Sequence, residues 1–322
     1  MTVFVVELGY ALSSEEHGPN DLVDYAVRAE DLGFSFAFVS DHYHPWIPRQ
    51  GESPFVWATL GGIARETDDL SVGTGVTCPI VRLHPAVVAQ AAATAGAMFE
   101  GRFLLGVGTG ENLNEHVVGE RWPPYAVRQE MLEEAISVLR ALWTGEEVNH
   151  HGEFFTVEEA RLFTLPDEPP DLAVAAAGTD SATLAGRLGD ALVSVAPDGD
   201  VVEAFEREHA GDAPKYGQVT VCWAETEQQG RETVHEWWPN TGLPGELGQQ
   251  LRTPAQFEQA TQLVTEEKAT EHVPCGPDAD RHVEAIQAFA DAGFDHVYVH
   301  QVGPDQAGFF EFYESEVLPS FG

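Results

Sequence analysis

The chain has 322 residues, and its 53 acidic residues outnumber its 16 Lys and Arg residues, which gives a formal net charge of -37. A field of this sign repels phosphodiester backbones and anionic lipids, so we expect neither a nucleic acid nor a membrane as a partner. The chain is 43% hydrophobic, and its apolar residues recur in regular runs. This pattern excludes a disordered chain, and the length is enough to bury a full core.

The cysteine content and the charge distribution indicate the cellular compartment in which the protein works. The three cysteines cannot form a disulfide framework, which favours a reducing environment. No N-terminal segment joins basic residues to an apolar run, and no uncharged segment reaches the roughly 18 residues of a membrane span. We therefore expect a cytoplasmic protein. Its dispersed acidity suggests adaptation to a salt-rich cytoplasm, where ions screen the self-repulsion.

Short strands alternate with amphipathic helices along the chain. The first half predicts a strand at 2–8, a helix that Asn20 caps and Gly33 ends, a strand at 36–40, a helix at 56–65, a strand at 70–77, a helix at 84–99, a strand at 103–107 and a helix at 128–143. The second half predicts a hairpin at 148–157 with Gly152 in its turn, strands at 172–176, 191–195, 219–224 and 296–300, and helices at 181–188, 201–209, 280–292 and 306–317. Residues 239–276 are rich in Gly, Pro, Gln and Glu and are expected to form a partly helical insertion.

Eight strands that alternate with about eight helices predict an α/β fold, a (β/α)8 TIM barrel that spans residues 1–322 as a single domain. A doubly wound sheet is the alternative. Such a sheet normally has a phosphate-binding glycine loop after its first strand, and residues 7–12 contain none.

The loop at 41–46 (Asp-His-Tyr-His-Pro-Trp) follows the second predicted strand, and barrel enzymes place their active sites at such strand ends. His42 can exchange a proton near neutral pH, and Trp46 offers an apolar wall with one donor. His42 and His44 also have the spacing of metal-dependent barrel hydrolases. That interpretation needs further ligands, and the later strand ends offer only His300 and Asp198.

Glycines follow the third and fourth predicted strands. Residues 106–110 (Gly-Val-Gly-Thr-Gly) begin like the dinucleotide-binding pattern G-x-G-x-x-G. Glu111 occupies the position of the last glycine in that pattern, so the sequence departs from it. Glycines let the backbone approach a flat ligand, and Glu111 and Asn114 add hydrogen-bonding groups at the same rim. Gly75, inside a strand, indicates a bulge or a close backbone contact. Cys78 has no basic neighbour in the sequence and is expected to be a small buried residue.

Together these motifs resemble the coenzyme F420-dependent oxidoreductases of the luciferase-like superfamily, and in particular the F420-dependent glucose-6-phosphate dehydrogenase group. The resemblance covers nearly the whole chain and is weakest over 239–276. It rests on residues 8–10 (Leu-Gly-Tyr), 40–42 (Ser-Asp-His), 45–46 (Pro-Trp), 73–76 (Gly-Thr-Gly-Val), 85–90 (Pro-Ala-Val-Val-Ala-Gln), 106–111 (Gly-Val-Gly-Thr-Gly-Glu) and 114–115 (Asn-Glu).

The resemblance implies a deazaflavin coenzyme, F420, bound across the third and fourth strand ends of a barrel that usually forms a homodimer. It also implies a cis peptide between Gly75 and Val76. The implied coenzyme-binding residues are Asp41, Gly75, Val76, Cys78, Gly108, Thr109, Gly110, Asn114, Ala177 and Gly178.

The resemblance further implies a catalytic group of four residues. His42 is expected to be the general base that takes the hydroxyl proton as a hydride leaves the carbinol carbon. Glu111, if burial keeps it protonated, can donate to the ring of the coenzyme. Trp46 is expected to orient the substrate, and Glu15 to hydrogen-bond or tune His42.

The sequence departs from the glucose-6-phosphate enzymes at the basic residues that hold the phosphate group. Two of these positions are occupied here by Asp198 and His272. A neutral sugar, polyol or secondary alcohol therefore fits better than a sugar phosphate. The alternatives are a flavin mononucleotide (FMN) monooxygenase, a metal-dependent hydrolase and a barrel that binds the coenzyme without catalysis.

Overall fold

Eight parallel strands form a closed barrel in the computed structural model, which describes residues 6–321. The strands are β1 (Glu7–Leu12), β2 (Phe36–Val39), β3 (Ser71–Thr74), β4 (Phe103–Val107), β7 (Asp171–Ala175), β8 (Ala191–Ser194), β9 (Lys215–Val221) and β10 (His296–Gln301). Each strand pairs with its sequence neighbour, and β1 pairs with β10 to close the ring. The predicted (β/α)8 architecture is confirmed.

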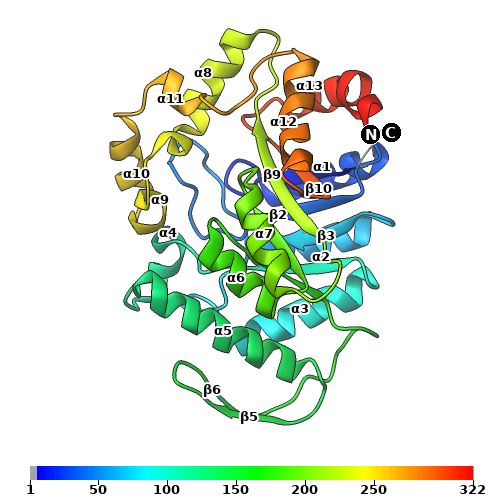
Figure 1. Ribbon diagram of the computed structural model, residues 1–322, viewed down its shortest axis with the longest axis vertical. Helices are drawn as coiled ribbons and strands as arrows, with labels where there is room; N and C mark the ends of the chain where they lie inside the picture. The colour runs from blue at the N-terminus through cyan, green and yellow to red at the C-terminus, as the bar shows by residue number, and fades with distance from the viewer. Residues whose placement is uncertain (1–5, 322) are drawn as a thin grey trace.

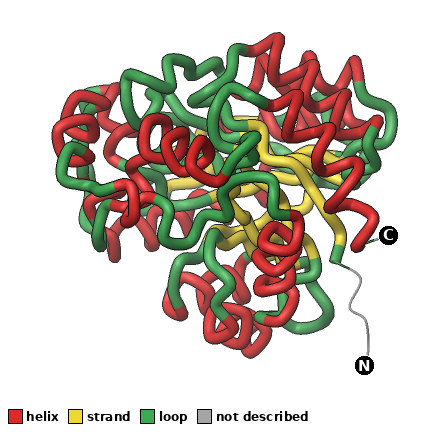
Figure 2. The backbone as a smooth tube through the Cα atoms, turned by 90° about the horizontal axis from the view of Figure 1, so that it is seen from above, coloured by secondary structure: helices red, strands yellow, loops and turns green. Residues whose placement is uncertain are grey.

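Helices surround this barrel on its outside, as Figure 2 shows. They are α1 (Pro19–Asp31), α2 (Val56–Glu66), α3 (Pro85–Phe99), α5 (Tyr125–Leu142), α6 (Thr179–Leu188), α7 (Gly199–Glu208), α12 (Ala279–Asp291) and α13 (Gln306–Phe312). The chain ends in the short helical turns η3 (Tyr313–Val317) and η4 (Leu318–Ser320). Within residues 6–321, no helix combines the length and the apolar character that crossing a bilayer requires.

The protein has two concentric apolar layers. The outer layer lies between strands and helices and contains fully buried residues such as Leu22, Leu60 and Leu105. The inner layer fills the barrel itself, where the Phe38 and Tyr298 rings pack with their centroids 4.8 Å apart. Because side chains plug the barrel, the space for a ligand lies at its mouth.

An extra segment joins β9 to α12. It consists of α8 (Glu227–Trp237), η2 (Pro239–Gly242), α9 (Leu247–Gln250), α10 (Pro254–Thr261) and α11 (Glu266–Ala269). Figure 1 shows α8 to α11 gathered at one side of the barrel. The segment has a small core of its own around Trp238, Val264 and Val273. The predicted insertion is therefore partly helical, as expected, but it starts earlier, with the polar helix α8, which the sequence analysis missed.

Two short elements follow β4 before the next barrel strand. Helix α4 (Asn112–Glu115) and the turn η1 (His116–Val118) come directly after the glycine-rich residues. The hairpin β5 (Val148–His151) and β6 (Thr156–Ala160) lies apart from the barrel in Figure 1. Gly152 lies between its strands, as predicted.

Several predicted boundaries are wrong. The first strand was expected at 2–8, partly outside the described residues, but β1 runs on to Leu12. Gly9 therefore lies inside it, where the Phe36 ring occupies the space of a side chain. Helix α1 begins after Gly18, with Pro19 in its first turn, so Asn20 is not its cap. Strand β9 begins at Lys215 rather than 219, which brings Gln218 into the barrel wall.

Candidate active site

A cavity of about 340 Å³ opens at the carboxyl ends of the barrel strands. Ten residues predicted for the site line it: Glu15, His42, Trp46, Gly75, Val76, Gly108, Thr109, Gly110, Glu111 and Ala177. Four others do not line it: Asp41, Cys78, Asn114 and Gly178.

His42 and Glu15 form an ion pair at one end of this cavity, with 3.3 Å between Nε2 and Oε1. Both side chains are nearly buried, and the other ring nitrogen, Nδ1, lies 3.2 Å from the carbonyl oxygen of His44. Two acceptors therefore face the ring, and a protonated His42 can donate to both. In the neutral ring, Nδ1 can donate to the His44 carbonyl, which leaves the lone pair of Nε2 able to take up a proton beside the Glu15 carboxylate.

The Glu15 carboxyl is held in its charged form. Burial raises its pKa, but the neighbouring His42 and the hydrogen bond from Ser40 Oγ, at 2.6 Å, more than offset this effect. The net pKa lies below the ordinary value of a glutamate. An ionised Glu15 can orient His42 and stabilise its cationic form.

Trp46 forms a wall beside this pair. Its ring centroid lies 5.0 Å from that of His42, and Phe257 supports its other side at 5.2 Å. The side chain of Gln50 accepts a hydrogen bond from the backbone N–H of Trp46 at 2.8 Å, which fixes the turn. The indole thus offers an apolar surface next to the imidazole of His42.

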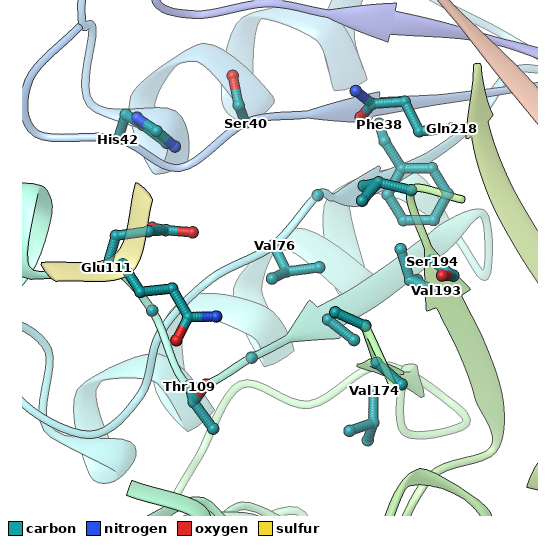
Figure 3. A pocket seen from close by; sticks show the side chains of 18 of the residues that line it. Phe38, Ser40, His42, Val76, Thr109, Glu111, Val174, Val193, Ser194 and Gln218 are labelled. Atoms are coloured by element: carbon teal, nitrogen blue, oxygen red, sulfur yellow. The ribbon is translucent and has the colours of Figure 1, made fainter. Parts of the chain in front are cut away.

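The wall opposite His42 is made of backbone and small side chains. Gly75 and Val76 are joined by a cis peptide, as the resemblance implied, and Val76 projects into the cavity between His42 and Glu111 on one side and Gln218 and Ser194 on the other (Figure 3). A Cβ atom on Gly108 would lie 2.8 Å from Val76 Cγ2, so the backbone at this position has to be bare.

Asp41, the residue before His42, has a different environment. Its carboxylate accepts hydrogen bonds from Arg82 Nη2 at 2.7 Å and from Thr77 Oγ1 at 2.8 Å, and its side chain is fully buried. Arg82 also lies 3.5 Å from Glu115. We refer to Asp41, Arg82 and Glu115 as the buried ionic cluster. The predicted role of the Asp41 side chain in touching a ligand therefore has no support from its placement.

Asn114 is likewise buried and connects two loops. Its Oδ1 accepts hydrogen bonds from the backbone N–H groups of Tyr43 and His44, at 2.9 and 3.2 Å, and its Nδ2 donates to Glu111 at 3.3 Å. It thereby joins the loop that bears His42 to Glu111. Its predicted direct contact with a ligand has no support, but it positions two residues that face the cavity.

Cys78 and Gly178 also lie outside the cavity lining. Cys78 packs behind Gly110, where a Cβ atom would lie 2.5 Å from its sulfur, and burial raises the pKa of its thiol well above the ordinary value. It is thus the small buried residue that the sequence predicted. Gly178 precedes the first turn of α6, and the side chain of Ser181 donates to its carbonyl oxygen at 2.9 Å.

The arrangement of the histidines departs from the metal interpretation. His44 Nδ1 is bonded to the carbonyl oxygen of Leu113 at 3.0 Å, and its ring stacks on His116. It therefore does not converge with His42. In the part of the chain from residue 6 to residue 321, no three His, Cys, Asp or Glu residues are placed to hold a metal ion.

Known proteins are similar to this chain in sequence and fold. The family model described as luciferase-like monooxygenase matches residues 1–296. The chain belongs to this luciferase-like family. It is 33% identical over 328 residues to an F420-dependent glucose-6-phosphate dehydrogenase of Microbacterium testaceum, covering 98% of this chain and 97% of that one. An enzyme of the same name from Intrasporangium calvum is 34% identical over 330 residues, which are 98% of each chain.

A solved luciferase-like structure is similar over almost the whole chain. It is an F420-dependent secondary alcohol dehydrogenase in complex with an F420-acetone adduct, with a TM-score of 0.90 and 31% sequence identity. The superposition covers 98% of this chain and 99% of that one. A type II Baeyer-Villiger monooxygenase in complex with FMN has a TM-score of 0.69 at 19% identity, which shows the shared fold alone.

The luciferase-like barrel also brings residues to its cavity that sequence reasoning missed. Glu16, next to Glu15, bonds His300, and His300 lines the cavity. The extra segment contributes Trp238 and Gln249. His300 could have been found from its position at the end of the last strand, where it had been considered only as a metal ligand. Nothing in the sequence around Trp238 or Gln249 marks them as part of a site.

Proposed function

We propose that this protein transfers a hydride between coenzyme F420 and a neutral substrate that bears a hydroxyl group, and that His42 takes up the hydroxyl proton. The observation that carries the proposal is the His42–Glu15 pair, which faces a wall of bare backbone across one cavity. The protein is an F420-dependent oxidoreductase that acts on CH–OH groups, as are its similar relatives.

The cavity fits a planar coenzyme. Gly75, Val76, Gly108 and Gly110 line the cavity and provide a surface on which a flat ring can lie at close range. Thr109 and Ala177 line the same side and would hold the remainder of the molecule. When bound, F420 supplies a ring carbon that accepts or gives a hydride, which leaves proton transfer and orientation to the protein.

The proton chemistry falls to residues at the other wall. His42 would accept the hydroxyl proton at one of its ring nitrogens, and the ionised Glu15 would stabilise the cation that results. Trp46 would keep the reacting carbon in place and exclude water. Glu111, held by Asn114, would hydrogen-bond to the ring of the coenzyme.

The lining of the cavity argues for an uncharged substrate. Among the described residues that form it, none is Lys or Arg, whereas Glu15 and Glu111 are acidic. Asp198, where the resemblance implies a basic residue in the sugar-phosphate enzymes, lies outside this lining and accepts a hydrogen bond from the backbone N–H of Asp200 at the start of α7. A phosphate beside a carboxylate about 4 Å away would be repelled by several kcal/mol at an effective dielectric constant near 20.

The proposal is tested by following the absorbance of oxidised F420 in molar salt. We expect sugars, polyols and secondary alcohols to reduce it, and we expect glucose 6-phosphate to be a poorer substrate than glucose. FMN provides the second arm of the experiment. Purified yellow protein that consumes oxygen with reduced FMN, and that leaves F420 oxidised with every alcohol, would contradict the proposal.

We also propose that the protein works as a homodimer of single-domain subunits in a salt-rich cytoplasm. Helix α3 exposes Val87 and Met98, whose side chains are 54% and 39% exposed, and such apolar residues suit a contact between copies. The net charge of -37 would destabilise the fold in dilute salt. Light scattering across a salt series tests whether the protein is a dimer and whether the dimer depends on salt. We expect a dimer in molar salt, and a monomer at every salt concentration would contradict the proposal.

A further inference from the structure

Two consecutive carboxylates follow β1, and they serve two different histidines. Strand β1 lies between β2 and β10 in the barrel. Glu15 bonds His42, after β2, whereas Glu16 bonds His300, within β10. The proposed function uses only the first of these pairs, so the second needs an explanation.

The His300–Glu16 pair is more deeply buried than the first. His300 Nε2 lies 3.1 Å from Glu16 Oε2, and the other carboxylate oxygen accepts a hydrogen bond from the backbone N–H of Gly303 at 2.9 Å. Because the ionised carboxylate only accepts, Nε2 carries the proton of this bond. Nδ1 is then left with one contact, the Thr220 hydroxyl at 3.5 Å, which is at the limit of a hydrogen bond.

We propose that His300 is a second hydroxyl-binding residue of the substrate site and that the substrate is therefore a neutral polyol or sugar. This inference rests on the proposed function, since it assumes that His42 receives the reacting hydroxyl. His300 binds another hydroxyl of the same molecule, and Glu16 is the positioning residue that fixes the ring. A substrate with one hydroxyl group leaves His300 without a partner.

The surroundings of His300 suit a molecule with an apolar face and several hydroxyl groups. The Trp238 ring lies 4.5 Å from the His300 ring in an edge-to-face arrangement and lines the cavity. Trp46, which packs on the same small core as Trp238, lines it beside His42. Aromatic walls accept the C–H face of a sugar while polar groups take its hydroxyls.

The spacing of the two histidines also agrees with this substrate class. Strands β2 and β10 are second neighbours, so their axes lie about 10 Å apart at a spacing of about 4.8 Å per strand. Imidazole side chains that line the cavity from the loop after β2 and from β10 shorten this gap. A chain or ring of several carbons can bridge it.

The inference is tested by steady-state kinetics with glucose, sorbitol and cyclohexanol on the wild type, His300→Phe, His300→Gln and Glu16→Gln. We expect His300→Phe to raise KM for glucose and sorbitol about 10- to 100-fold, with kcat nearly unchanged and cyclohexanol unaffected. His300→Gln, which keeps a polar group, should recover part of the loss. His296→Gln is the matched control, because His296 lies on the same strand but outside the cavity lining.

A binding measurement without coenzyme separates this inference from the proposed function. Glucose and sorbitol should quench the fluorescence of Trp46 and Trp238 in the wild type, and the change should be lost in His300→Phe. If F420 stays oxidised while this binding pattern holds, the proposed function fails, and only the binding of a hydroxyl group by His300 is supported. If cyclohexanol reduces F420 better than every polyol, or if His300→Phe harms all substrates equally, the inference is overturned.

Discussion

Asp41 and His42 are adjacent in the chain, yet they belong to two regions with opposite properties. His42 and Glu15 face the cavity, where a ligand can reach the imidazole. Asp41 belongs to the buried ionic cluster, where Arg82 and Thr77 take up its carboxylate oxygens. The same loop thus presents an imidazole to the cavity on one side and closes a buried ion pair on the other.

The difference shows how one stretch of polar residues can serve both chemistry and stability. A desolvated charge is costly unless its partner stays in place, so the cluster holds the loop rigidly. The His42–Glu15 pair also has hydrogen-bonding partners, but both of its residues line the cavity. Asn114 connects the loop to Glu111, so the loop that the buried ionic cluster holds also fixes a residue that lines the cavity.

The comparison between the two regions is tested most strongly by removing His42, the proposed proton acceptor. We expect His42→Ala to lower kcat about 10²- to 10⁴-fold, the usual contribution of a positioned acid or base. The measurement is F420 reduction under saturating substrate. His44→Gln, on the same loop but outside the cavity, should keep its activity, and an active His42→Ala would remove the assigned role.

The next largest effect is expected in the buried ionic cluster. Asp41→Asn leaves Arg82 without its nearest carboxylate, and we expect a loss of about 3–5 kcal/mol in the free energy of unfolding. Denaturant unfolding in molar salt measures it. Glu314→Gln removes an exposed partner of Arg28 and should cost less than about 1 kcal/mol. Equal losses in the two variants would show that the cluster does not hold the loop.

Glu115 makes the stability of the cluster depend on pH. Burial raises its pKa to about 7, because Arg82 lies closer to Asp41 and compensates Glu115 only in part. The folded state therefore binds a proton that the unfolded state releases, so stability should fall as pH rises from about 4.5 to about 7, by roughly 1 kcal/mol per pH unit. Unfolding curves of the wild type and Glu115→Gln across this range should diverge, and parallel curves would contradict the assignment.

Glu15 should give the opposite and smaller pH dependence. Burial raises its pKa, but His42 and Ser40 lower it further, so the folded state holds its proton more weakly than the unfolded state. Its contribution to stability is present above the ordinary pKa of a glutamate and is lost as pH falls through the lower, folded-state value. The acid limb of the stability curve should be flatter in Glu15→Gln. A steeper limb in this variant would show that folding raises the pKa of Glu15 instead of lowering it.

The sequence by itself was sufficient for the architecture and for the neighbourhood of the site. Eight apolar runs of strand length separated by amphipathic helices leave few folds other than a barrel, and barrels gather their strand ends at one mouth. Residues 41–46 and 106–111 follow directly from that rule, since each lies where a strand ends. The motifs around them, including Gly75 and Val76, were enough to identify the family.

Only the tertiary structure decided which way each of these residues turns. Asp41 and His42, or Glu15 and Glu16, differ in environment because neighbouring side chains point to different sides of a loop whose path depends on distant partners. Arg82 takes Asp41 out of the cavity, and His300 gives Glu16 a separate role. Trp238 reaches the mouth from an insertion whose local pattern has no relation to the site. Contacts between residues far apart in sequence leave no periodic signal, so they emerge only when the barrel closes.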